Sequence, residues 1–366
     1  MVNKLEASIF RLPNEVLSET LGLVIDLERS SYDPYPRFRV RGREWPVASL
    51  DSAHHFIEWL SCTTELNISG HAMVNYGVQQ PSLSIFISRT LNCLTRLTIL
   101  RFYGDLISLP SVLEGLADLG NSRPNLPALE IYNIMGSRSD SHWQTLRDCK
   151  GTAPIKSLKL DYYGQTPQAL EALIRWPKKL QKLWFRPFCA WSTGQSGLFS
   201  RWSFAVMQPI LETQMANLRE LSIPDLDIGG IEDLDFSNFM KLEILKLPST
   251  VTRYRAGDVP RLVAPNLRVF EWRVINGNNE CEEEVDDFGQ EQEDWVRAFV
   301  RRAVDCKTKL ETFYIEFSPI MGRVYRNVVY PWDRMDSVAR QSEPHGIKIR
   351  YSPPTFSKED LAYWMI

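Results

Sequence analysis

The sequence lacks the patterns that bind metal ions or form disulfide frameworks. Its six cysteines are scattered singly through 366 residues, with no C-x-x-C pair and no histidine at a metal-ligand interval. Only five histidines are present, and none lies in an H-E-x-x-H motif. We therefore expect reduced thiols and no metal or other cofactor.

Motifs for nucleophilic catalysis and phosphate binding are also missing. The segment Gly194–Gly197 fits neither the G-x-S-x-G elbow nor the phosphate-binding loop, because no lysine follows at the required step. Carboxylate pairs such as Asp225 and Asp227 are common at surface turns, and nothing in the sequence desolvates one member of the pair. We expect a chain that is not an enzyme.

The chain has no excess of positive charge and no long apolar run. Lys and Arg number 42 against 45 Asp and Glu, a net charge of −3, which argues against a nucleic-acid partner. No stretch approaches the roughly 18 apolar residues of a membrane helix, and the charged first 30 residues do not form a secretory signal. We expect a cytoplasmic or nuclear protein that binds neither nucleic acid nor membranes.

A leucine frame of the form L-x-x-L-x-L recurs along the chain. Successive complete copies start 29, 29, 25, 38, 24, 25 and 43 residues apart, and most of these intervals match the 20–29 residues of leucine-rich repeats. Partial copies occur at 66–68 and 347–349. The complete copies begin at Leu97, Leu126, Ile155, Leu180, Leu218, Leu242, Leu267 and Leu310.

The frame has a simple physical interpretation. Alternate residues of a short strand point inward, and one such strand cannot bury its own apolar face, so parallel strands of successive repeats must stack. We therefore predict an α/β fold over 49–366, a leucine-rich-repeat-like curved solenoid with its parallel sheet on the concave face. Return helices are expected at 111–119, 166–177, 204–215 and 294–306. An α/β domain of another topology is the alternative.

An acidic segment over 278–294 interrupts the repeats. Its nine carboxylates have no Lys or Arg among them, and removing them from the net charge of −3 leaves +6 on the remainder. Such a run repels itself and is typical of a solvated loop. A dock for a basic partner and a calcium site are the alternatives, although the spacing of an EF-hand loop is absent. The carboxylates are Glu280, Glu282, Glu283, Glu284, Asp286, Asp287, Glu291, Glu293 and Asp294.

The amino-terminal residues 9–27 predict an amphipathic helix. Leu12-Pro13 suits the first turn, and apolar residues recur at steps of three and four. Considered alone, this helix would cap the exposed end of the repeat array. The recurring apolar residues are Val16, Leu17, Leu21 and Val24.

The same segment resembles a known family. Leu12-Pro13-x-Glu15-Val16-Leu17 is similar to the opening L-P-x-E-[IVL]-L of the F-box, and a downstream repeat array is the domain order of F-box proteins with leucine-rich repeats. Residues 38–45 loosely match the closing segment of the family, whereas prolines occupy the middle, where the family has its second helix. The resemblance implies a degenerate, helical F-box-like segment over residues 1–48.

The resemblance also implies a function. F-box proteins bind the linker subunit of a cullin-type ubiquitin ligase, and their repeats hold the client protein. We therefore expect a substrate-recruiting adaptor; the alternative is a non-catalytic, repeat-type binding module whose first helix only caps the solenoid. The residues implied to contact the linker subunit are Leu12, Pro13, Glu15, Val16, Leu17 and Leu21.

Strand alternation also predicts the client-binding face. With the fourth and sixth frame positions inward, the fifth and seventh point to the concave surface. Tyr, Trp and Arg often dominate interfaces, so we place the centre at Trp184, Arg186 and Tyr132, with a loop carrying Trp191 and Trp202 as one wall. An ordinary mixed-charge surface is the alternative. The predicted face comprises Arg101, Tyr103, Tyr132, Lys159, Trp184, Arg186, Arg273 and Tyr314.

Overall fold

The chain divides into two compact units, Met1–Lys179 and Leu180–Ile366. The computed structural model describes residues 37–40, 43–46, 65–69, 96–103, 126–133, 144–188, 202–224, 233–252, 254–274, 288–317 and 329–360.

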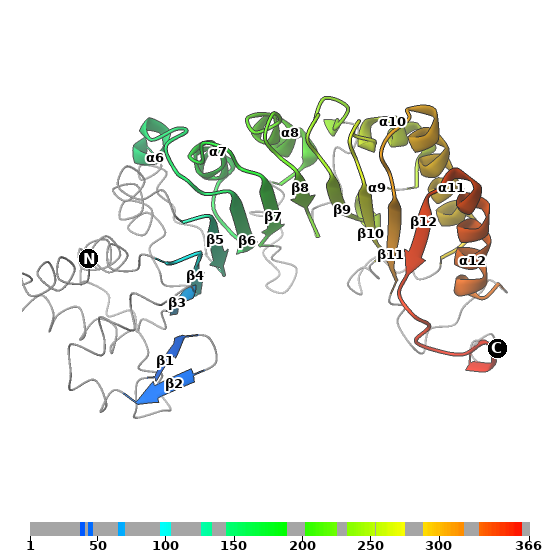
Figure 1. Ribbon diagram of the computed structural model, residues 1–366, viewed down its shortest axis with the longest axis horizontal. Helices are drawn as coiled ribbons and strands as arrows, with labels where there is room; N and C mark the ends of the chain where they lie inside the picture. Colours follow the sequence, from blue (N-terminus) through cyan, green and yellow to red (C-terminus); the bar gives the residue numbers. More distant parts are fainter. Residues whose placement is uncertain are drawn as a thin grey trace, which may run out of the picture. The chain divides into compact units, whose positions relative to one another are not determined.

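The described strands of the first unit's sheet are parallel and pair in chain order. They are β3 (Glu65–Ser69), β4 (Ile99–Tyr103), β5 (Ala128–Tyr132) and β6 (Ser157–Tyr163). The described helices of this unit are α6 (Gln144–Asp148) and α7 (Pro167–Arg175). Both lie to one side of β5 and β6 in Figure 1.

Local sequence explains α7. The Thr166 hydroxyl accepts a hydrogen bond from the Ala169 N–H (3.3 Å), and Pro167 occupies the first turn, where its missing N–H is no loss. Ala169, Leu170 and Leu173 are fully buried on its inner face. The helix expected over 166–177 is confirmed.

An antiparallel hairpin precedes the sheet of the first unit. Its strands, β1 (Arg37–Val40) and β2 (Arg43–Pro46), place Phe38 opposite Trp45. The described part of the segment 1–48, which the resemblance implies to be helical, is therefore β structure.

The described strands of the second unit's sheet also run parallel and in chain order. Figure 1 shows helices along one side of this sheet. The strands are β7 (Lys182–Pro187), β8 (Glu220–Ser222), β9 (Ile244–Pro248), β10 (Val269–Val274), β11 (Thr312–Phe317) and β12 (Lys348–Tyr351). The helices are α8 (Phe204–Glu212), α9 (Ser249–Thr252), α10 (Val259–Leu262), α11 (Gln290–Asp305) and α12 (Pro331–Ser342), with 3₁₀ turns at Ala256–Asp258 and Glu343–His345.

The leucine frame sets the register of the strands. Leu129 lies opposite Leu100 on one side and Leu158 on the other. The fourth and sixth positions of all eight complete frames are at most 1% exposed. Most first positions are buried too, whereas Leu126 is half-buried. The expected α/β chain with parallel strands is confirmed.

A repeated backbone contact leads into successive strands. The Arg219 carbonyl accepts hydrogen bonds from the N–H groups of Glu243 and Ile244 (2.8 and 3.0 Å), the second and third positions of the next frame. The carbonyls of Gln181, Glu243 and Arg268 accept the same pair of bonds from the frames that follow them. Each strand of this series therefore begins with the same local geometry.

Helix α11 covers an aromatic core in the second unit. Trp295 stacks on Trp272 with ring centroids 4.6 Å apart, and Phe299 lies 4.3 Å from Phe270. All four side chains are at most 1% exposed. Phe270 and Trp272 occupy frame positions that hold leucine in other repeats, and the rings of Trp295 and Phe299 on the long helix α11 cover them.

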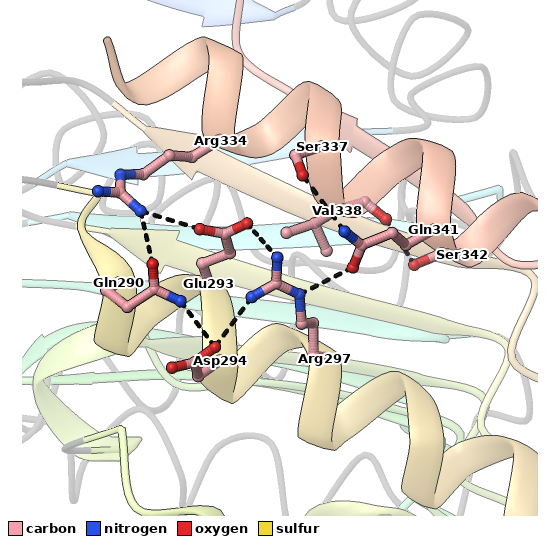
Figure 2. Close-up of polar contacts among 9 residues, drawn as sticks. All are labelled: Gln290, Glu293, Asp294, Arg297, Arg334, Ser337, Val338, Gln341 and Ser342. Atoms are coloured by element: carbon pink, nitrogen blue, oxygen red, sulfur yellow. Dashed lines mark hydrogen bonds and ion pairs between the residues drawn. The ribbon is translucent and has the colours of Figure 1, made fainter. Parts of the chain in front are cut away.

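Part of the acidic segment is helical. Helix α11 begins at Gln290, where the Gly289 N–H donates to the Gln292 side chain (2.9 Å), and acidic residues in the first turn favour the helix dipole. Glu293 is buried, and its carboxylate accepts hydrogen bonds from Arg297 and from Arg334 of α12 (Figure 2). The loop expected over 278–294 is therefore helical from Gln290 onward; residues 275–287 lie outside the described part.

Candidate functional site

The clearest candidate site lies on the outward positions of β4, β5 and β6 in the first unit. Alternation along these strands buries the leucine frame and turns the intervening side chains to the opposite face of the sheet. These outward side chains are half-buried and in contact with one another. We call Arg101, Tyr103, Glu130, Tyr132 and Lys159 the tyrosine cluster.

A network of ion pairs and hydrogen bonds holds the side chains of Arg101 and Tyr132 in place. Arg101 donates through Nε to Glu130 Oε2 (2.7 Å) and through Nη1 to Glu65 Oε2 (2.9 Å), so it bridges β3 and β5. The Tyr132 hydroxyl donates to the same Glu130 oxygen (2.7 Å). Because charged groups share these bonds, the side chains are held in one arrangement.

The aromatic rings lie side by side across the strands. Tyr103 and Tyr132 are stacked, with centroids 4.4 Å apart and planes inclined by 11°. Lys159, on the strand at the other side of β5, places its Nζ 4.9 Å from the centroid of Tyr132. The cluster therefore presents the edges of two stacked rings with a cation beside them, which suits binding better than proton transfer.

The protonation states of Tyr132 and Arg101 are fixed at neutral pH. Burial and the hydrogen bond to Glu130 raise the pKa of the Tyr132 hydroxyl well above its usual value. Burial alone would lower the pKa of Arg101, but its bonds to Glu130 and Glu65 outweigh this and raise it. Tyr132 is a neutral donor and Arg101 a permanent cation.

An alkaline titration tests this electrostatic arrangement. We expect Tyr132 to stay protonated beyond the pH of about 10 at which exposed tyrosines ionise. The protonated Tyr132 hydroxyl stabilises the folded state fully at pH values below the pKa that it has in the unfolded chain. This stabilisation is lost as the pH rises through the raised pKa of the hydroxyl in the folded state. The phenolate absorbance of the wild type minus that of Tyr132→Phe reports this residue. Glu130→Gln should shift its ionisation to lower pH, and an unshifted titration would contradict the proposed hydrogen bond.

The remaining predicted client residues belong to the second unit. Trp184, Arg186 and Tyr314 are half-buried at outward positions, and the Tyr314 hydroxyl lies 3.4 Å from Ser352 Oγ. Arg273 is exposed and pairs with a carboxylate of the neighbouring strand, Glu316 (3.2 Å). Of the three residues predicted at the centre of the client-binding face, Tyr132 belongs to the first unit, and Trp184 and Arg186 belong to the second.

Trp202 corrects one expectation. Its side chain is only 5% exposed and packs edge-to-face on the inward Phe185, with centroids 5.0 Å apart. It therefore belongs to the core and is not a wall of the client surface. Trp191 lies outside the described residues, as do the implied linker contacts Leu12, Pro13, Glu15, Val16, Leu17 and Leu21.

The residues predicted for the client-binding face leave out the two carboxylates that bind Arg101. Glu65 and Glu130 orient Arg101, and Glu130 also orients Tyr132. A usable signal was present, because Arg101 and Glu130 occupy the same frame position in consecutive repeats. Opposite charges at one position of adjacent repeats indicate a cross-strand pair.

Comparison with known proteins leaves the family open. No protein-family model matches the chain, and no similar sequence is found among curated proteins. Within the described ranges, no three His, Cys, Asp or Glu side chains gather into a possible metal site. Across those same residues, no helix is long and apolar enough to cross a membrane.

Proposed function

We propose that this chain is a leucine-rich-repeat-like solenoid that recruits a client protein to a cullin-type ubiquitin ligase. The tyrosine cluster carries the client-binding half of the proposal. Two observations support the solenoid: the recurring leucine frame, and the pair of hydrogen bonds that the carbonyl at the second frame position repeatedly accepts from the next frame. The sheet face opposite the helices then serves as the recognition surface, and the ubiquitin chemistry belongs to other subunits.

The tyrosine cluster is suited to client recognition because it is rigid before binding. Tyrosines bury large areas at little entropic cost, and the contacts among Arg101, Glu130 and Tyr132 already fix the ring positions. The charges within the cluster have both signs, so a protein with complementary patches fits it better than a uniformly charged polymer.

The amino-terminal segment carries the ligase half of the proposal. Its opening resembles the F-box motif, and the proposed contacts with the linker subunit are apolar and acidic side chains within the helix that the sequence predicts over residues 9–27. They are Leu12, Pro13, Glu15, Val16, Leu17 and Leu21.

One observation favours the second candidate, a free binding module. Strand β1 contacts β3, which ties part of the amino-terminal segment to the sheet of the first unit. A segment joined to the sheet in this way suits a cap on the repeat array. The two functions differ in one property, the affinity for the linker subunit.

Binding of the purified full chain to the purified linker subunit separates the two functions. For the adaptor we expect a stable complex, measured by calorimetry, that Leu17→Asp weakens at least tenfold, or about 1.4 kcal/mol, because a charge enters an apolar contact. Met240→Asp is the control, because Met240 is 58% exposed and belongs to the second unit. No complex, or equal binding by Leu17→Asp, would overturn the adaptor function and leave the free module.

A further inference from the structure

Strand β12 lies at the edge of its sheet, and one of its two sides is not paired with any strand in the part of the chain that the structure describes. The Lys348 N–H donates to the Glu311 carbonyl (2.9 Å) and the Ser352 N–H to the Ile315 carbonyl (3.0 Å), both toward β11. Peptide groups alternate in direction along a strand, so those of Ile349 and Tyr351 face the other edge. No strand in the described part of the chain pairs with that edge (Figure 1).

Two cations lie along this edge. Lys348 and Arg350 are exposed at outward positions two residues apart, and neither forms an ion pair with the described residues. The carboxylates in and directly before the neighbouring strand β11 are already engaged, because Glu311 pairs with Arg268 (2.9 Å) and Glu316 with Arg273 (3.2 Å). With respect to the part of the chain that the structure describes, the edge therefore offers unmatched positive charge.

Elsewhere in the second unit, cations on the outward face pair with carboxylates of the next strand. Lys182 pairs with Glu220 (3.0 Å), and Lys246 with Glu271 (2.9 Å). A strand placed beside β12 would continue this pattern if it carried acidic residues at alternate positions.

We propose that the β12 edge binds an extended acidic segment of a partner protein by strand addition. The peptide groups of Ile349 and Tyr351 supply the backbone hydrogen bonds, and Lys348 and Arg350 select carboxylates at every second residue. Pairing with the β12 of a second copy of this chain is disfavoured, because that strand carries the same two cations. The site uses neither the tyrosine cluster nor the amino-terminal segment, so it goes beyond the proposed function and stands independently of it.

A labelled seven-residue peptide of alternating valine and glutamate tests the charge selection. We expect it to bind the full chain, measured by fluorescence anisotropy, and to bind the Lys348→Glu/Arg350→Glu variant about tenfold more weakly. The control, Lys241→Glu/Arg301→Glu, changes the net charge equally at two exposed positions away from the edge and should stay within about twofold of wild type. Absence of peptide binding, or equal losses in both variants, would overturn the proposal.

Amide hydrogen exchange tests the strand addition itself. Saturating peptide should slow exchange at Ile349 and Tyr351, because their N–H groups become hydrogen-bonded. The same peptide N-methylated at alternate residues keeps its charges but lacks the required donors, and it should bind about tenfold more weakly. Unchanged exchange at both amides, or full binding of the methylated peptide, would show contact by charge alone and contradict the proposal.

Discussion

Replacing Trp272 with alanine is expected to lower the free energy of unfolding by about 3–5 kcal/mol. The side chain is fully buried in β10, where its ring stacks on Trp295 at 4.6 Å and meets Phe313 edge-on at 6.3 Å. Its Nε1–H also donates to Thr252 Oγ1 (3.3 Å), so truncation leaves both a cavity and a buried hydroxyl with one bond fewer. Urea unfolding of the full chain measures the loss.

Trp184→Ala is the matched control for Trp272→Ala. It removes the same side chain from the outward face of β7, where the residue is half-buried, and should cost roughly 1 kcal/mol. Equal losses at the two positions would mean that the inward and outward faces of the second unit's sheet are wrongly assigned.

Glu293→Ala should also lower the free energy of unfolding, by about 1.5–3 kcal/mol, because two half-buried arginines each lose a charge-assisted hydrogen bond to a buried carboxylate. The Glu293 side chain is only 6% exposed, and its carboxylate accepts hydrogen bonds from Arg297 and from Arg334 (2.9 Å), joining α11 to α12 (Figure 2). Thermal and urea unfolding of the full chain report the change.

The neighbouring acid supplies the control for Glu293→Ala. Asp294 pairs with the same Arg297 (2.9 Å), but its side chain is 60% exposed, so Asp294→Ala should cost less than about 1 kcal/mol. A loss at Glu293 no greater than that at Asp294 would show that the pairing of α11 with α12 contributes little to stability.

The strands could be predicted because one short pattern determines them. The frame places apolar residues at alternate positions, and burial of Leu129, Leu158 and Leu245 on one face follows from that spacing alone. Helix α7 could likewise be predicted from local sequence, because Thr166 and Pro167 mark its start. Parallel pairing followed because each repeat contains enough residues to cross over.

The missed features depend on contacts between distant residues. The charge pattern of 278–294 indicates a solvated loop, and nothing local shows that Arg334 of α12 will pair with Glu293. Glycine and serine indicate a loop before Trp202, but they do not show that its ring will pack on Phe185. The carboxylates around Arg101 become visible only when the register of β3, β4 and β5 is known.

Client turnover in cells tests recruitment to a ligase most directly. Proteins that copurify with the wild-type chain after proteasome inhibition are identified, and their half-lives are compared in cells carrying the wild type, Leu17→Asp or Tyr103→Ala/Tyr132→Ala. We predict a client whose capture is lost only with the double tyrosine variant and whose half-life lengthens with both variants. A captured protein whose half-life is the same in all three cell lines would contradict recruitment for ubiquitination.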